Sequence, residues 1–87
     1  MPRTHELKTL SPFWDAIESG EKTFEIREND RGFQKGDLLV LKRYKPGEVY
    51  ARPPELKRQI TYVLSGWGLK NGYVALGLGP LGPGGKE

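Results

Sequence analysis

The chain has 87 residues, with 14 lysines and arginines, 11 acidic residues, one histidine and no cysteine. This length fits one small domain and excludes a TIM barrel or a two-half dinucleotide-binding fold. Without cysteine there is no disulfide, thiolate zinc site or cysteine nucleophile, and a single histidine disfavours a histidine-rich metal site. We therefore expect no metal and no cofactor. No apolar run approaches the ~20 residues of a membrane span and the first residues are polar, which predicts a cytoplasmic protein without a membrane partner.

The N-terminal part predicts one short helix. Residues 4–10 form either a first strand or an extended lead-in. The pair Ser11-Pro12 is typical of a helix start, because the serine hydroxyl can cap the first turn and proline is tolerated there. The helix should cover residues 12–19 and end at Gly20. Its predicted apolar face consists of Phe13, Ala16 and Ile17. Two turns are too few to stand alone, so this face must pack on a sheet.

Residues 22–28 alternate between apolar and polar side chains, which predicts a half-buried strand. Phe24 and Ile26 would face the core, and a charged outer face would consist of Thr23, Glu25 and Arg27. Residues 29–33 form a loop by composition.

The remainder of the chain predicts further strands without alternating helices. They are expected over residues 38–44, 58–65 and 73–78, separated by a loop at 45–57 and a glycine-rich loop at 66–72. This order argues against a parallel βαβ sheet and favours a small, curved, mostly antiparallel sheet or barrel capped by the helix. The folded domain would span residues 1–78, followed by a disordered tail, rich in proline and glycine, at 79–87.

The charged strand face is the most informative feature for function. Glu25 supplies an acceptor and Arg27 supplies donors two residues later, with Thr23 on the same face and Lys22 at the strand start. Such a set can recognise a base edge or an amide. The alternative is a solvated edge strand with an ordinary Glu–Arg pair. Asn29, Asp30 and Arg31 extend the polar row, or serve the turn.

Basic residues concentrate later in the chain. Residues 1–31 carry a net charge of −2 and residues 32–87 carry +5. Six of the later cations lie close together: Lys42, Arg43, Lys45, Arg52, Lys57 and Arg58. They form either a phosphate-contact patch, with Tyr44 and Tyr50 interleaved, or an ordinary solvated loop.

Three ring residues have two interpretations each. Trp67, between two glycines, can stack on a base or fold back onto the sheet. Trp14 is favoured as a packing residue because a small core needs large side chains, and Phe33 as a plug under the 29–36 loop. His5 is a general base or a polar surface residue.

The series of short motifs resembles the ASCH domain of the PUA-like superfamily, closest to a compact bacterial and phage ASCH-like family of unassigned function. The resemblance covers about residues 4–78 and rests on His5-Glu6-Leu7-Lys8, the Gly-Glu-Lys-Thr-Phe-Glu-Ile-Arg segment at 20–27, and Gly72-Tyr73-Val74-Ala75-Leu76-Gly77. It implies a small PUA-like β-barrel that binds RNA in a cleft between barrel and helix. On the matching positions, Lys22, Thr23, Glu25 and Arg27 would line that cleft, approached by His5 and Lys8.

The same resemblance implies a second activity. Some ASCH relatives deacylate an acylated cytidine with a lysine, a threonine and a glutamate, and others have been associated with RNA cleavage. Their lysine falls on Lys22, but their threonine falls on Glu25, so this chain departs from the pattern at the nucleophile.

Three hypotheses follow. The first is an RNA- or nucleotide-binding module that recognises a base, with binding residues Lys8, Lys22, Thr23, Glu25, Arg27, Arg31 and Trp67. The second is an enzyme acting on a modified nucleoside or RNA with Lys22 and Glu25 as its acid–base pair. The third is an adaptor for a protein partner.

Overall fold

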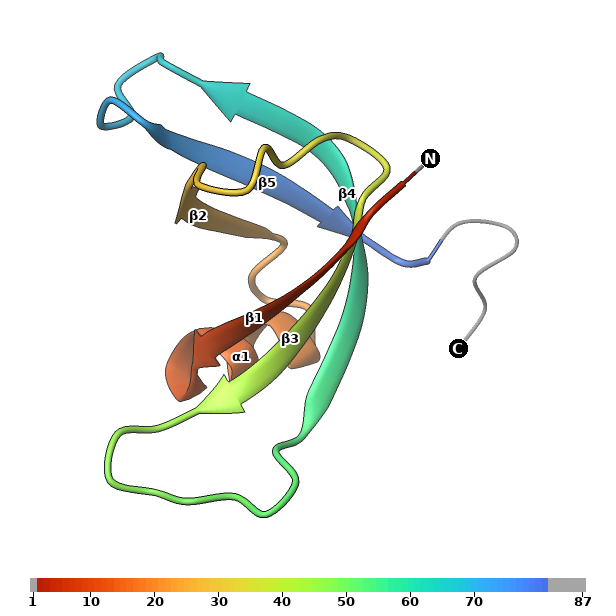
Figure 1. Ribbon diagram of the computed structural model, residues 1–87, viewed down its shortest axis with the longest axis vertical. Helices are drawn as coiled ribbons and strands as arrows, with labels where there is room; N and C mark the ends of the chain where they lie inside the picture. The colour runs from red at the N-terminus through yellow and green to blue at the C-terminus, as the bar shows by residue number, and fades with distance from the viewer. Residues whose placement is uncertain (1, 82–87) are drawn as a thin grey trace.

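The computed structural model describes residues 2–81, which form five strands and one helix (Figure 1). The elements are β1 (Thr4–Leu10), α1 (Ser11–Ser19), β2 (Phe24–Glu28), β3 (Leu38–Tyr44), β4 (Glu55–Ser65) and β5 (Tyr73–Gly79). The prediction of a mainly β domain with one short helix is confirmed, and residues 4–10 are a strand. The predicted tail begins inside β5, and residues 82–87 lie outside the described part of the chain. Within residues 2–81, no helix is long and apolar enough to cross a membrane.

The strands form one mixed sheet in the order β1-β3-β4-β5-β2. Three pairings are antiparallel, in line with the mostly antiparallel sheet expected from the sequence, and β1 and β3 run parallel. A parallel pair needs a long crossover, and residues 11–37 provide it with the helix and β2. The 11-residue strand β4 pairs with β3 through its first half and with β5 through its second, and a bulge between Ile60 and Tyr62 lets it bend (Figure 1).

The sheet remains open, with β1 and β2 at its edges, so the closed barrel expected from the sequence is not formed by backbone pairing within residues 2–81. Arginine side chains join the two edges instead. Arg27 on β2 donates to the Lys8 carbonyl on β1 at 2.8 Å, and Arg31 donates to the Glu6 carbonyl at 3.0 Å. These guanidinium groups satisfy edge carbonyls that would otherwise be available to another strand.

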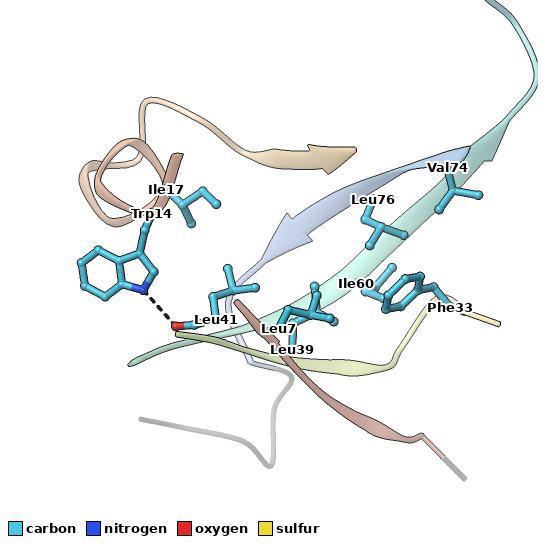
Figure 2. Packing of buried hydrophobic residues seen from close by; sticks show 9 residues of the cluster. All are labelled: Leu7, Trp14, Ile17, Phe33, Leu39, Leu41, Ile60, Val74 and Leu76. Atoms are coloured by element: carbon cyan, nitrogen blue, oxygen red, sulfur yellow. Dashed lines mark hydrogen bonds between the residues drawn. The ribbon is translucent and has the colours of Figure 1, made fainter. Parts of the chain in front are cut away.

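The core lies between the curved sheet and α1 (Figure 2). Its buried hydrophobic residues are Leu7, Trp14, Ile17, Phe33, Leu39, Leu41, Ile60, Val74 and Leu76. Burial of Phe33 confirms the predicted plug, and burial of Trp14 confirms its predicted packing role.

The helix buries only part of the face predicted for it, since Ile17 is buried as expected and Phe13 is not. Trp14 and Ile17 point to the sheet, whereas Phe13 is 48% exposed. Trp14 buries the larger ring, and its indole Nε1 donates to the Leu41 carbonyl at 2.9 Å, which ties the helix to β3. Ser11 lies inside the helix and does not cap it, because Leu10 occupies the N-cap position. The predicted stop at Gly20 is confirmed: its φ is 86° and its N–H donates to the Ile17 carbonyl at 3.1 Å.

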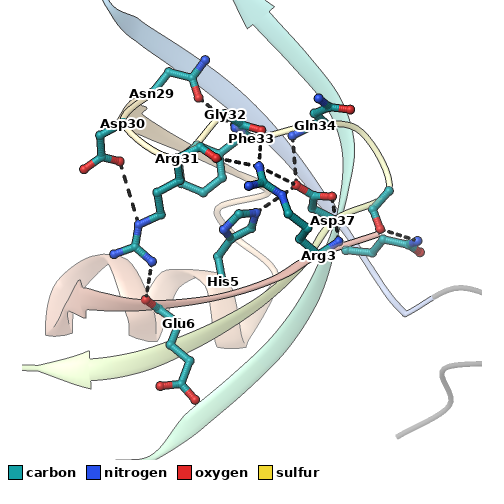
Figure 3. A network of polar contacts seen from close by, with 12 residues as sticks. Arg3, His5, Glu6, Asn29, Asp30, Arg31, Gly32, Phe33, Gln34 and Asp37 are labelled. Carbon is teal, nitrogen blue, oxygen red and sulfur yellow. Dashed lines mark hydrogen bonds and ion pairs between the residues drawn. The ribbon is translucent and has the colours of Figure 1, made fainter. Parts of the chain in front are cut away.

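A polar cluster fastens the loop before β3 to β1 (Figure 3). The buried Asp37 carboxylate contacts His5 Nε2 at 2.9 Å, and accepts from the Arg3 and Gln34 amides at 3.1 Å each. His5 packs edge-on against Phe33, with ring centroids 4.8 Å apart. Asn29 accepts from the Phe33 amide, which supports the turn interpretation of that residue. These contacts place His5 in the core as a structural residue.

We expect Asp37 to make the stability of the fold depend on pH in the acidic range. Burial alone would raise its pKa, but the hydrogen bonds from His5, Arg3 and Gln34 hold the pKa below its ordinary value of 3.8. A lowered folded pKa stabilises the fold above the unfolded value, and this contribution is lost as the pH falls through the folded value. We expect Asp37→Asn to lower the free energy of unfolding by about 2 kcal/mol at neutral pH. The gap from the unchanged protein should close below pH 3.8.

Urea unfolding of both proteins between pH 7 and pH 2.5 (about the range over which carboxylates titrate) checks this expectation. Asp30→Asn is the control, because Asp30 is exposed in the neighbouring loop. A constant gap between Asp37→Asn and the unchanged protein across the whole series would contradict it.

Candidate functional site: the β2 cleft

Strand β2 has the predicted alternation but the opposite orientation. Glu25 is only 4% exposed, whereas Phe24 and Ile26, predicted to be buried, are 45% and 50% exposed. The register explains this, because Glu25 pairs with Leu76, whose side chain lies in the core, so both point inward. A buried carboxylate is tolerated only where cations and donors surround it. The charged face of β2 is therefore its inner face.

Glu25 lies between two cations, Lys22 and Arg27, and we call these three residues the Glu25 ion cluster. Lys22 Nζ lies 2.6 Å from Glu25 Oε1, and Arg27 Nε lies 3.0 Å from Oε2. Arg27 also donates to Thr9 Oγ1 at 3.1 Å, which anchors the cluster to β1. An ionised carboxylate has about four acceptor positions. Lys22 and Arg27 use two of these positions, and the residue is only 4% exposed.

The cluster lies at a surface cleft of about 580 Å³, called here the β2 cleft. Its lining residues are Lys8, Leu10, Phe13, Lys22, Phe24, Glu25, Ile26, Arg27, Glu28 and Tyr73. They come from the end of β1, the start of α1, the whole of β2 and the start of β5. The cleft thus opens beside the gap between the two edge strands.

Aromatic rings flank the charged floor of the cleft. The Lys22 ammonium lies 5.2 Å from the centre of the Phe13 ring and 4.6 Å from that of Phe24. Both rings are about half exposed, at 48% and 45%. Exposed apolar side chains around buried charge are typical of sites that bind a ligand with flat apolar faces and polar edges.

The structure brings together four of the seven predicted binding residues, namely Lys8, Lys22, Glu25 and Arg27. Thr23 is exposed and lines a separate hollow near Gly20 and Leu78. Arg31 bridges to the β1 edge outside the cleft. Trp67 is 89% exposed in the turn between β4 and β5, where it has a φ of 53°.

The sequence did not indicate the walls of the cleft. Six lining residues were missed: Leu10, Phe13, Phe24, Ile26, Glu28 and Tyr73. The first four were assigned to the core or to no role, because an apolar residue in an amphipathic segment is buried in most proteins. One usable signal was the Glu–Arg pair at 25 and 27, since a self-neutralising pair can occupy an inner face.

The predicted phosphate patch is partly neutralised by neighbouring carboxylates. Arg43 binds both oxygens of Asp15, at 2.9 and 3.0 Å. This bond lowers the pKa of Asp15 and raises that of Arg43. Lys42 lies near Glu6 and Glu55, and Lys45 near Glu48. Tyr50 is also engaged, since its hydroxyl donates to Glu48 at 2.8 Å. Half of the six cations therefore have carboxylate partners.

The chemistry available in the β2 cleft is that of two carboxylates, two lysines and an arginine. Across the described residues, no three His, Asp or Glu side chains gather in a way that could hold a metal ion. The floor can donate from Lys22 and Arg27 and accept at Glu25. This combination matches the mixed donor and acceptor edge of a nucleobase.

Comparison with known proteins gives two matches. The model of a family described as "Domain of unknown function (DUF3850)" matches residues 4–78. The chain is also 31% identical, over 67 residues, to an uncharacterized 12.9 kDa protein in the GpA 3′ region of Escherichia phage P2. That alignment covers 77% of this chain and 62% of the phage protein, so the chain spans less than two thirds of that relative's length.

Proposed function

The chain belongs to the DUF3850 family, and we propose that it is an RNA- or nucleotide-binding module whose β2 cleft holds one base against the Glu25 ion cluster. The observation that carries this proposal is a buried carboxylate with two cationic donors beneath two half-exposed aromatic rings. A base needs both kinds of contact, because its edges hydrogen-bond and its faces stack.

The size and charge of the site support the same ligand. A cleft of about 580 Å³ falls within the range of small-ligand pockets and suits one nucleotide. The charged lining residues are Lys8, Lys22, Arg27, Glu25 and Glu28, which together carry a net charge of +1. The excess positive charge favours a phosphate attached to the bound base.

The proposal includes the fold. The curved five-stranded sheet, with its edges joined by arginine side chains, supports kinship with the PUA-like barrels of the ASCH type. In this chain the barrel would be incomplete between β1 and β2, which is where the cleft opens.

Replacing Glu25 with glutamine tests the proposal. Glutamine keeps the shape of the side chain but removes the charge and replaces one acceptor oxygen with a donor NH2 group, so we expect binding of short RNAs or nucleoside monophosphates to weaken about tenfold. The measurement is titration calorimetry at about 50 and about 200 mM salt, since phosphate contacts weaken as salt rises. Circular dichroism reports whether the variant is folded.

The matched control is Glu18→Gln, on the exposed side of α1 and outside the β2 cleft. It should bind as the unchanged protein does. Absence of binding by the unchanged protein at low salt, or equal affinity for Glu25→Gln and the unchanged protein, would contradict base recognition in the cleft.

One contact favours a second candidate function. The 2.6 Å approach of Lys22 Nζ to Glu25 Oε1 forms a pair able to exchange a proton at the cleft floor. Such a pair could serve the hydrolysis of an acylated cytidine or of RNA. Incubation with acylated cytidine and with labelled RNA decides this: turnover that Lys22→Ala abolishes would favour an enzyme, and intact substrates would leave the binding module.

A further inference from the structure

The outer face of β2, β5 and β4 carries a second aromatic surface next to the β2 cleft. Because side chains alternate along a strand, the residues of β2 that do not face the core share the outer face with their pairing partners. The register gives two rows across the three strands: Phe24–Gly77–Tyr62 and Ile26–Ala75–Leu64. Phe24, Ile26 and Tyr62 are 45%, 50% and 63% exposed. We call these two rows the outer platform.

The outer platform has small side chains in its middle and large side chains on both sides. Gly77 and Ala75 form the floor on β5, between Phe24 on one side and Tyr62 on the other. A Cβ atom on Gly77 would stand 3.0 Å from Thr61 Oγ1, so a larger residue here would fit tightly against the bulge in β4. Two strand spacings place the aromatic residues about 10 Å apart. The register therefore places small residues on β5 between an aromatic residue on β2 and one on β4.

Two lysines lie beside aromatic rings of the outer platform and of its neighbour Tyr73. Lys22 Nζ lies 4.6 Å from the centre of the Phe24 ring, and Lys70 Nζ lies 5.5 Å from that of Tyr73. Tyr73 belongs to the same face of β5, four residues from Gly77. One carboxylate, Glu28, pairs with Tyr73 and lies at that end. Aromatic side chains with lysines beside them suit single-stranded nucleic acid, whose bases stack and whose phosphates pair with cations.

From this arrangement, and resting on the proposed function, we propose that the ligand is a single-stranded RNA of about three nucleotides rather than a free nucleotide. One base occupies the β2 cleft, and the strand continues over Phe24 and across Gly77 to stack on Tyr62. Phe24 lines the cleft and belongs to the outer platform, so the two surfaces are continuous. The Glu28 carboxylate repels phosphate at the Tyr73 end of the outer platform, so the RNA strand runs toward Tyr62.

Calorimetry with uridine monophosphate and with the uridine trinucleotide tests this proposal. The trinucleotide should bind about tenfold more tightly than the monophosphate, because each stacked base adds affinity. Tyr62→Ala should weaken the trinucleotide about tenfold and leave the monophosphate unchanged. Glu28→Gln should strengthen the trinucleotide, with the larger gain at low salt. Trp67→Ala, in the exposed β4–β5 turn, is the control and should change neither.

Each result has one meaning. Equal affinity for both ligands, or no effect of Tyr62→Ala on the trinucleotide, overturns the platform and leaves the cleft proposal intact if Glu25→Gln still weakens binding. If Tyr62→Ala weakens trinucleotide binding and Glu25→Gln does not, the platform proposal is supported and base recognition in the cleft is contradicted. If Trp67→Ala weakens trinucleotide binding and Tyr62→Ala does not, the platform proposal is overturned. It is also overturned if the protein is a dimer that Tyr62→Ala dissociates. Failure of both ligands to bind overturns both proposals.

Discussion

Replacing Arg27 with methionine is expected to lower the free energy of unfolding by about 3 kcal/mol, because the buried Glu25 carboxylate loses one of its two cationic partners. Glu25 would keep only Lys22 in an environment where its side chain is 5% exposed. The β1 carbonyl of Lys8 and the Thr9 hydroxyl would lose their donor as well. Methionine preserves the length and apolar stem of the side chain, so the loss reports the guanidinium group. Urea denaturation at neutral pH measures it.

Two further variants make this expectation specific. Arg52→Met, at an exposed position, should change stability by less than about 0.5 kcal/mol. The double variant Glu25→Met, Arg27→Met should recover much of the loss, because replacing a buried ion pair with apolar groups is often neutral. If Arg27→Met were as harmless as Arg52→Met, the Glu25 ion cluster would not hold the sheet edges together.

Replacing Trp14 with alanine should cost about 4 kcal/mol, the largest loss expected for any single residue of α1. The ring is 6% exposed and fills the space between the helix and β3. Its removal leaves a cavity and also leaves the Leu41 carbonyl without its side-chain donor. Thermal and urea unfolding provide the measurement.

Phe13→Ala is the matched control, because Phe13 has a similar size and is 48% exposed on the same helix. Its cost should stay below about 1 kcal/mol. A larger loss for Phe13→Ala than for Trp14→Ala would mean that the helix packs through the face predicted from the sequence. Trp14→Phe separates the two contributions, since it keeps an aromatic ring and removes the indole donor.

The strands and the end of the helix were predictable because local rules determine them. Alternation of apolar residues marked β2, and a continuous apolar run marked β3. A single glycine ended α1 in the left-handed conformation that glycine adopts freely. The orientation of these elements was not predictable, because it depends on partners distant in the chain. Phe13 and Trp14 are adjacent, and only the Leu41 carbonyl on β3 explains why Trp14 turns inward.

The candidate site shows the same division. Local spacing predicted that Lys22, Glu25 and Arg27 would lie together, and they do. That Glu25 faces the core depends on its register with Leu76, which lies 51 positions later in the chain. Because β2 turns the opposite face to the core from the one expected, Phe24 and Ile26 lie in the wall of the cleft and not in the core. The parallel pairing of β1 with β3 is likewise a long-range choice that no local pattern encodes.

The most direct test of base recognition is a nuclear magnetic resonance titration of the isotope-labelled protein with nucleoside monophosphates and a short RNA. The proposed base recognition predicts that the largest amide shift changes fall on β2 (Phe24–Glu28), on Lys22, and on Lys8 and Phe13 across the cleft. Glu25→Gln should reduce these changes at equal ligand concentration. Shift changes confined to the loop between β3 and β4, or none at all at low salt, would contradict a ligand site in the β2 cleft.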